Sequence, residues 1–384
     1  MLLLVDGTAM KGVDILKQIV HPWHESLKNP AEAQQQILEQ LLEGYAKTGY
    51  GKSHSADTIK DGATFRANVP SINYAGLRPY LEEVKAGDYS VILPEPPLCW
   101  VMTRGSTGNS KVLPVTKTHI EQIFWCGARA ITNYALRMDS MDVLAWKILN
   151  LNFPSAVTTT DAGGQTITYG YSSGTYAKLN PMLNQVSLLP RQEEIDALGS
   201  GISRLDWEKR FELVYQSALN QPVVAAIGVT PVILSFARYV KHRHGKQPKD
   251  LWNFKVLVCT SVRKIQFKYG PVLRKFFGEE VPIVEMYSAT EGAFMQQLDD
   301  LPYVSPNYDA YYFEVETGKG TQMLHELERG EWGRLIISSC LFPRYDIGDM
   351  IEAMGKNYFR IFGRAKPLTI LEHRLYRLFF GWSL

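Results

Sequence analysis

The sequence predicts an α/β protein. Helical and strand-like segments alternate along its 384 residues, which is the pattern of this class. Segments 255–259 and 281–287 are short apolar runs of the kind buried in parallel sheets, and a helix-compatible segment, 268–277, separates them. With 45% apolar and 21% charged residues, the chain has an ordinary globular composition and can bury a large core.

The segments between 255 and 287 predict a strand–helix–strand unit. Proline lacks a backbone N–H, so Pro282 is expected at the start of the second strand, with pairing from Ile283 onward. Pro271 must likewise fall in the first turn of the helix. The residues after Tyr287 then follow the carboxyl end of a buried strand, and ligands of open sheets bind at that edge.

Apolar residues at helical spacing predict further helices. One spans 30–47, with Asn29 as its cap, and a second spans 118–137, with Thr118 in a capping box. Asp206 is expected to cap a third helix. Additional strands are expected at 143–149, 166–171, 310–316, 334–339 and 358–362.

Charge and cysteine content exclude several classes of protein. The 41 basic and 39 acidic residues leave a net charge of +2, without the basic excess of nucleic-acid or membrane-surface proteins. The four cysteines form no C-x-x-C pair, so neither a zinc knuckle nor a disulfide framework is indicated. No apolar run approaches the roughly 20 residues of a membrane span. We therefore expect a cytoplasmic protein with no nucleic-acid or membrane partner.

The most informative segment is the polar loop 103–111, T-R-G-S-T-G-N-S-K. Its glycines let the backbone approach an anion closely, and its hydroxyl and N–H groups can surround phosphate oxygens. Lys111 adds a positive charge at the end of the loop. The spacing does not match a Walker loop, and composition alone is equally compatible with a plain connection between two regular elements.

A carboxylate and a turn-rich acidic segment follow far downstream. Glu291 comes shortly after the buried strand that ends near Tyr287, and a carboxylate there is a suitable hard ligand for Mg²⁺ beside phosphates. Asp349 belongs to the segment D-I-G-D, which on its own also suits a turn. Its two oxygens can accept several hydrogen bonds.

Taken in order, segments 103–111, 286–291, 344–349 and 361–366 resemble the motifs of the adenylate-forming superfamily. Four positions in these segments depart from the usual pattern: Arg104 for a small residue, Ser110 for proline or an aliphatic residue, Ser288 for glycine and Ile347 for threonine. The resemblance implies the large N-terminal domain of that superfamily, with mixed and parallel sheets flanked by helices. It also implies ATP and Mg²⁺ as cofactors.

The resemblance assigns a role to individual residues. It implies that Tyr287 packs on adenine, Thr290 contacts the α-phosphate and Glu291 holds Mg²⁺. It further implies that Asp349 and Arg364 bind the ribose. The residues implied in catalysis are Thr103, Ser106, Thr107, Lys111, Thr290 and Glu291, and those implied in binding the nucleotide are Gly105, Gly108, Ser261, Val262, Tyr287, Asp349 and Arg364.

Segments 50–52, 77–81, 86–88 and 228–231 narrow the resemblance to the auxin-responsive acyl-acid amido synthetases. This family implies activation of a small carboxylic acid as an acyl-adenylate and transfer of the acyl group to an amine such as an amino acid. Phenylacetate–CoA ligases have a similar layout, so a thiol acceptor and a CoA thioester product stay open as an alternative.

The resemblance divides the chain into an adenylating domain, 1–363, and a segment, 364–384, that is the hinge and the remnant of a C-terminal domain. Only 20 residues follow Arg364, so the small C-terminal domain is expected to be absent or truncated. A non-catalytic nucleotide-binding descendant of such an enzyme is therefore a second alternative.

Two further expectations concern the substrate and a different chemistry. The acyl pocket is expected between helix 118–137 and segment 223–236, lined mostly by apolar side chains. The pentapeptide 170–174, G-Y-S-S-G, matches a nucleophile elbow with Ser172 at its centre, which leaves a serine hydrolase as a formal alternative.

Overall fold

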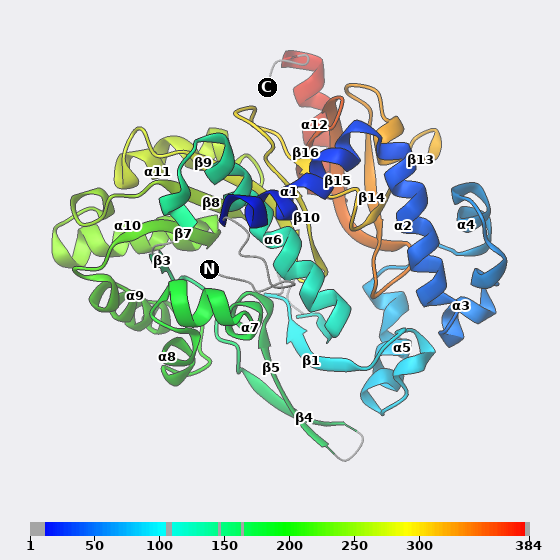
Figure 1. The fold of residues 1–384 in the computed structure, drawn as a ribbon, viewed down its shortest axis with the longest axis horizontal. Coiled ribbons are helices and arrows are strands. Elements are labelled where there is room, and N and C mark those ends of the chain that lie inside the picture. Colours follow the sequence, from blue (N-terminus) through cyan, green and yellow to red (C-terminus); the bar gives the residue numbers. More distant parts are fainter. Residues whose placement is uncertain (1–11, 105–109, 145–146, 163–164, 381–384) are drawn as a thin grey trace.

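The computed structural model describes residues 12–104, 110–144, 147–162 and 165–380. Within this part of the chain the strands form three sheets, and helices flank them (Figure 1). The predicted α/β class, with mixed and parallel sheets between helices, is confirmed. No helix of the described part combines the length and the apolar character needed to cross a membrane.

The sheets differ in size and in strand direction. A four-stranded sheet has the order β2-β1-β5-β4, a seven-stranded mixed sheet has the order β11-β10-β9-β8-β7-β3-β6, and a five-stranded antiparallel sheet has the order β13-β12-β14-β15-β16. The bounds of the strands are β1 Pro97–Met102, β2 Val112–Thr116, β3 Lys147–Leu149, β4 Thr158–Ala162, β5 Gln165–Tyr171, β6 Leu188–Leu189, β7 Val223–Val229, β8 Val256–Thr260, β9 Ile283–Ala289, β10 Gly292–Gln296, β11 Ser305–Pro306, β12 Tyr312–Thr317, β13 Gly320–Met323, β14 Trp332–Ser338, β15 Tyr345–Gly355 and β16 Tyr358–Arg364.

The α-helices are α1 Gly12–Lys28, α2 Pro30–Tyr45, α3 Gly49–Ser53, α4 Gly62–Asn68, α5 Tyr74–Lys85, α6 Lys117–Arg137, α7 Ser172–Leu179, α8 Gln192–Ala197, α9 Arg204–Ala218, α10 Thr230–His244, α11 Gly270–Phe277 and α12 Pro367–Phe380. Short 3₁₀ turns occur at Ala56–Thr58, Tyr89–Val91, Met141–Leu144, Pro248–Asp250 and Leu324–Glu326, and π-helical turns at Met182–Ser187 and Ile265–Tyr269.

The strand–helix–strand prediction is confirmed by β8, α11 and β9. The two strands are parallel, and the first pair joins Leu257 to Ile283, directly after Pro282. Pro271 lies in the first turn of α11, where its missing N–H breaks no helical hydrogen bond. The expected strands 166–171, 310–316, 334–339 and 358–362 correspond to β5, β12, β14 and β16.

One expected strand is shorter than predicted. Residues 143–149 were expected to form one strand, but a 3₁₀ turn occupies Met141–Leu144 and only Lys147–Leu149 is a strand. The segment around Asp349 is not a plain turn, because it lies inside β15, a strand of 11 residues. Gly348 within that strand has a φ of 80°, a conformation that glycine adopts without steric cost.

The expected helices are present, but their caps differ. The side chain of Thr116, not of Thr118, accepts the N–H of His119 and caps α6, while Glu95 accepts the N–H of Thr118. The cap of α9 is Ser203 rather than Asp206, which lies three residues further on.

Asn29 does occupy the cap position of α2. However, its side chain makes no capping hydrogen bond and instead donates to Glu32 at 2.6 Å. The helix-forming pattern of the sequence therefore predicted where the helices start. Which side chain caps each helix depends instead on the neighbouring groups in the folded chain.

The seven-stranded sheet is covered on both faces. Helices α6 and α7 pack on one face, where Ala130 and Tyr134 meet Val224 and Val256. Helices α9, α10 and α11 cover the opposite face (Figure 1). Because both faces are buried, the central strands are apolar over nearly their whole length.

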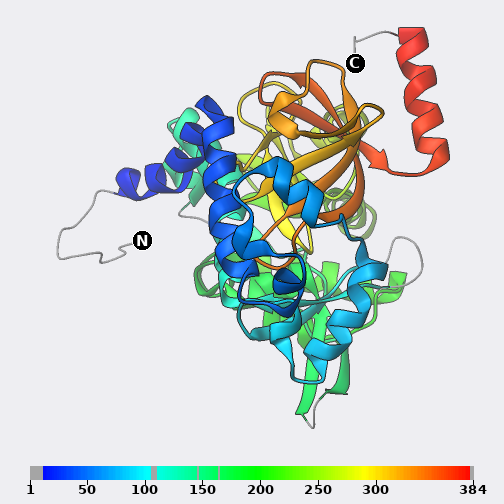
Figure 2. The same cartoon turned by 90° about the vertical axis from the view of Figure 1, so that its right-hand side faces the viewer.

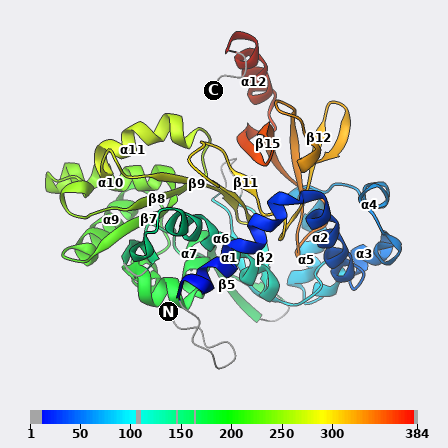
Figure 3. The same cartoon turned by 45° about the horizontal axis from the view of Figure 1, so that its top comes forward.

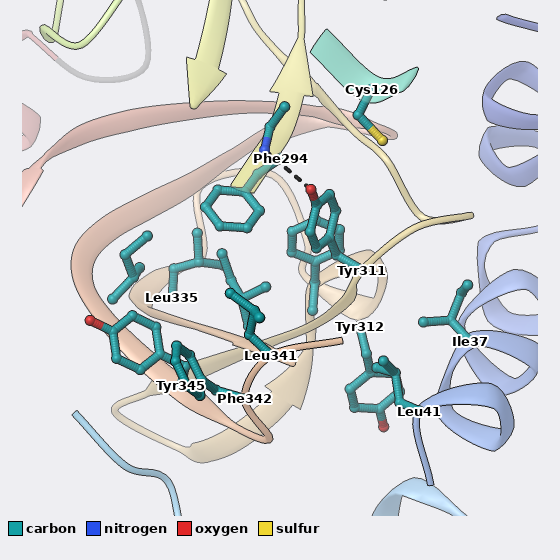
Figure 4. Close-up of a cluster of buried hydrophobic side chains, with 14 of the residues drawn as sticks. Ile37, Leu41, Cys126, Phe294, Tyr311, Tyr312, Leu335, Leu341, Phe342 and Tyr345 are labelled. Carbon is teal, nitrogen blue, oxygen red and sulfur yellow. Dashed lines mark hydrogen bonds between the residues drawn. The ribbon is translucent and has the colours of Figure 1, made fainter. Parts of the chain in front are cut away.

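The C-terminal sheet shares a core with the N-terminal helices. Leu335, Leu341, Phe342 and Tyr345 gather with aromatic side chains from β10 and the segment before β12, and α2 contributes Ile37 at the edge (Figure 4). Helix α12 projects from this sheet at the outer rim of the molecule (Figures 2 and 3).

A stacked histidine connects α12 to the C-terminal sheet. The His373 ring stacks on Phe362 with centroids 3.9 Å apart and meets Trp332 edge-on. Four leucines of the same helix are exposed: Leu368, Leu371, Leu375 and Leu378.

Candidate functional site

Groups that are far apart in the sequence meet where the β1–β2 hairpin approaches the end of β9. The Nζ atom of Lys111 lies 3.4 Å from Oε1 of Glu291, although 180 positions separate these residues. Lys111 also donates a hydrogen bond to the hydroxyl of Tyr345 at 2.8 Å, and that hydroxyl donates to Oε1 of Glu291 at 2.9 Å. A cation, a phenol and a carboxylate thus form one connected cluster.

Glu291 is presented by a tight connection. Strand β9 ends at Ala289 and β10 starts at Gly292, so only Thr290 and Glu291 join the two antiparallel strands. Both side chains are buried. The Thr290 hydroxyl shares a hydrogen bond with the Ser172 hydroxyl at 3.0 Å, and its carbonyl accepts one from Tyr176 at 2.7 Å.

Asp349 forms the second carboxylate of the site. Its Oδ2 atom accepts a hydrogen bond from the Tyr287 hydroxyl at 2.8 Å, and its Oδ1 atom lies 3.1 Å from Nε of Arg364. Burial raises the pKa of Asp349, an effect that the Arg364 guanidinium and the Tyr287 hydroxyl oppose. Because Tyr287 lies on β9, the strand that leads to Glu291, this contact brings Asp349 to the same end of the strand.

The end of β8 lies beside the end of β9. The hydroxyls of Thr260 and Ser288 share a hydrogen bond of 2.9 Å. Ser261 follows with a φ of 74° and is exposed, while Val262 is half-buried against the apolar core. Arg263 then donates to the carbonyl of Phe362 in β16. The structure therefore places Ser261 and Val262 at the same sheet edge as Tyr287.

The neck of the 103–111 loop is closed by hydrogen bonds. The N–H of Thr103 donates to the carbonyl of Lys111, and the N–H of Lys111 donates to the Thr103 hydroxyl at 3.0 Å. The predicted residues Gly105, Ser106, Thr107 and Gly108 lie outside the described residues.

Sequence reasoning did not single out Tyr345, Ser172 or Tyr176 as members of the site. Tyr345 lies within the recognised segment 344–349, so its motif was the available signal. The G-x-S-x-G pattern directed attention to Ser172 as a nucleophile, and Ser172 does follow a strand and begin a helix. Among the described residues its hydroxyl pairs with Thr290 and not with a histidine, which is the usual partner of a nucleophilic serine.

The donor set fits Mg²⁺ better than a protein-enclosed transition metal. Glu291 offers one hard carboxylate, and the described residues contain no group of three or more His, Cys, Asp or Glu side chains that could hold a metal. Mg²⁺ usually binds through one or two carboxylates together with substrate phosphates and water. Such an ion could therefore be held here by Glu291 and a nucleotide.

Two solved enzyme structures share this fold. An acyl acid amido synthetase in complex with 2,4-DB, AtGH3.15, superposes with a TM-score of 0.73 at 15% identity, covering 94% of this chain and 72% of that one. A 2-hydroxyisobutyryl-CoA ligase superposes with a TM-score of 0.63 at 14% identity, covering 94% of this chain and 81% of that one. The predicted superfamily fold is confirmed.

Sequence comparison specifies the family. The model described as the GH3 family N-terminal domain matches residues 20–228, and the chain belongs to the GH3 family. Indole-3-acetic acid-amido synthetase GH3.2 of Arabidopsis thaliana is 30% identical over 117 residues, which are 30% of this chain and 21% of that protein. Putative indole-3-acetic acid-amido synthetase GH3.10 of rice (Oryza sativa subsp. japonica) is 28% identical over 403 residues, covering 91% of this chain and 81% of that protein.

The matches to the first two curated relatives span only 21% and 16% of those proteins.

Proposed function

We propose that this protein activates a small carboxylic acid with ATP to an acyl-adenylate and then transfers the acyl group to an amine such as an amino acid. The observation that carries the proposal is that Lys111 meets Glu291 at the end of β9, while Asp349 contacts Tyr287 of the same strand. Membership of the GH3 family supports it, since the named relatives are amido synthetases.

In this proposal the nucleotide lies along the edge of the seven-stranded sheet where β8 and β9 end. Asp349 and Arg364 bind the ribose hydroxyls, and Tyr287 packs on the adenine beside Ser261 and Val262. Asp349 has acceptor positions left for the ribose, because Tyr287 and Arg364 occupy only part of its capacity.

The remaining groups serve the phosphates. The proposed phosphate contacts are Thr103, Gly105, Ser106, Thr107, Gly108, Lys111 and Thr290, with Glu291 as the metal ligand. Mg²⁺, when bound, neutralises negative charge on the phosphate oxygens. Lys111 is already directed toward the same place, because Tyr345 holds its ammonium group beside Glu291.

The chemistry that this arrangement suits is substitution at phosphorus. An oxygen of the substrate carboxylate attacks the α-phosphorus, pyrophosphate leaves, and a mixed anhydride with AMP results. An amine then attacks the acyl carbon and AMP leaves. Orientation and charge neutralisation supply most of the catalysis in such transfers, so the chain's part is to hold the reactants in line and to place cationic and hydroxyl groups around the phosphate.

A thiol acceptor is the second candidate. The similarity to a CoA ligase structure favours it, because that fold covers as much of this chain as the amido synthetase fold does. We favour an amine because the family model and the named sequence relatives point in that direction.

We also infer that residues 1–363 form the adenylating domain and that the hinge begins at residue 364. In support, β16 ends at Arg364 and α12 begins at Pro367, so a two-residue connection separates the last sheet from a helix. The acyl pocket is proposed between α6 and the segment that starts with β7.

The test is ATP–pyrophosphate exchange with a panel of aliphatic and aromatic acids. Exchange that depends on one acid supports adenylation, and mass spectrometry after adding amino acids or CoA identifies the acceptor. Binding of ATP without exchange for any acid indicates instead the non-catalytic descendant. Absence of ATP binding contradicts the proposal altogether.

A further inference from the structure

The connection between β9 and β10 lacks the geometry that such a short turn usually has. Two-residue hairpin connections favour primed turns, which have a positive φ in the first central residue and match the twist of the strands. Neither Thr290 nor Glu291 is among the residues with positive φ. The preferred turn geometry therefore does not fix this connection, and contacts from outside the hairpin can hold it in place.

Tyr176, on α7, provides the most direct of these contacts. Its hydroxyl donates to the carbonyl oxygen of Thr290 at 2.7 Å. Burial raises the pKa of Tyr176 far above the ordinary value, so the phenol keeps its proton. A phenol hydroxyl can donate one hydrogen bond, and here the Thr290 carbonyl accepts it.

His119, in the first turn of α6, makes a hydrogen bond with the Tyr176 hydroxyl. Its Nε2 atom lies 3.1 Å from the Tyr176 hydroxyl. Because that hydroxyl already donates to Thr290, it must accept here, which places the imidazole proton on Nε2. Consistent with this, Nδ1 is the ring nitrogen that has no hydrogen-bond partner. Burial lowers the pKa of His119 to about 4, so the ring is neutral.

We propose that Tyr176, held by His119, is a positioning residue for the Thr290–Glu291 turn. This inference rests on the proposed function only for its catalytic consequence. His119 donates to Tyr176, Tyr176 donates to the buried Thr290 carbonyl, and Ser172 fixes the Thr290 hydroxyl. Two helices thus set the place of the turn that carries the proposed phosphate contact and the proposed metal ligand.

Removal of the Tyr176 hydroxyl takes away the 2.7 Å hydrogen bond to the Thr290 carbonyl, so the turn is expected to shift. A small misplacement of a group that acts at the reacting centre lowers turnover more than substrate binding. We expect Tyr176→Phe to lower kcat for pyrophosphate exchange about 10-fold or more, with KM for ATP within about threefold of the wild type.

The matched control for the amide-exchange measurement described below is Tyr134→Phe. Tyr134 is also a buried tyrosine whose hydroxyl donates to a backbone carbonyl, that of Lys255, but this lies before the start of β8 and therefore at the opposite end of the strands. His119→Gln keeps an N–H at the place of Nε2, whereas His119→Leu removes it. We expect His119→Gln to retain most of the turnover and His119→Leu to behave like Tyr176→Phe.

Amide hydrogen exchange of segment 286–294, measured without nucleotide, tests the turn independently of activity. We expect amide hydrogen exchange in this segment to be at least about 10-fold faster in Tyr176→Phe and unchanged in Tyr134→Phe, because local opening follows the loss of local hydrogen bonds. Equal amide exchange rates in these two variants overturn the positioning role even if the enzyme is active. A wild type without exchange of pyrophosphate refutes the proposed function, and the amide data still decide the role of Tyr176.

Discussion

Replacement of Asp349 by asparagine tests the ribose site with little change in shape. The Asp349 side chain is buried, with Tyr287 on one oxygen and Arg364 near the other. An amide can still accept the Tyr287 hydrogen bond, but it loses the charge that strengthens hydrogen bonds from ribose hydroxyls. Hydrogen bonds to charged groups contribute about 1.5–3 kcal/mol and neutral ones about 0.5–1.5 kcal/mol.

The difference, about 1–2 kcal/mol, corresponds to an ATP Kd that is roughly 5- to 30-fold weaker. The variant should nevertheless remain as stable as the wild type. Burial raises the pKa of Asp349, so the folded protein disfavours its charge, and Arg364 is half-exposed and can be hydrated when it loses its partner. Loss of affinity without loss of stability is therefore the expected signature.

The assay is calorimetric titration with ATP and with 3′-deoxy-ATP. If Asp349 receives a ribose hydroxyl, the penalty for the missing hydroxyl is smaller in Asp349→Asn than in the wild type, since the two changes remove the same contact. Asp299→Asn is the control, because Asp299 also accepts a tyrosine hydroxyl, that of Tyr358, away from the site. An ATP Kd within twofold of the wild type in Asp349→Asn refutes the ribose assignment.

Three other predictions concern charge and stability. Lys111→Met should lower pyrophosphate exchange by about 100-fold, because it removes the cation beside Glu291; near-normal exchange argues against its role. Glu314→Gln removes the negative charge that pairs with the buried Arg344 guanidinium and should cost about 3–5 kcal/mol in urea unfolding, and a cost below 1 kcal/mol contradicts this. Burial raises the pKa of Glu285 from 4.5 to about 8, so the free energy of unfolding of the wild type falls as pH rises across that range. Glutamine does not ionise, so the Tm of Glu285→Gln relative to the wild type should increase from pH 5 to pH 9. An equal difference in Tm at both pH values contradicts this prediction.

Local chemistry made part of the fold predictable. Proline at 271 and 282 limited where α11 and the pairing of β9 could begin, and both limits hold because a missing N–H acts in any tertiary context. Caps were less predictable. Thr118 has suitable capping spacing, yet Glu95 accepts its N–H from another part of the chain, and the helix starts one residue earlier.

The ordered motifs predicted residues of the candidate site, but not the contacts that hold them. Lys111 and Glu291 could be named from the sequence, whereas the bridge through Tyr345 depends on where β15 passes relative to the β1–β2 hairpin. Tyr176 and His119 carry no motif. The hydrogen bond between His119 and Tyr176, and the one from Tyr176 to the turn, arise only when α6 and α7 pack together, and such long-range placement leaves no spacing in the sequence to recognise.

The site is built from elements of three different sheets. They are the β1–β2 hairpin of the four-stranded sheet, the β9–β10 turn of the seven-stranded sheet, and strands β15 and β16 of the C-terminal sheet. A small molecule that contacts all three elements links them to one another. Because it binds only the native state, it raises the melting temperature by mass action. Thermal-shift screening of metabolite mixtures can therefore reveal ligands of this protein before any turnover assay exists.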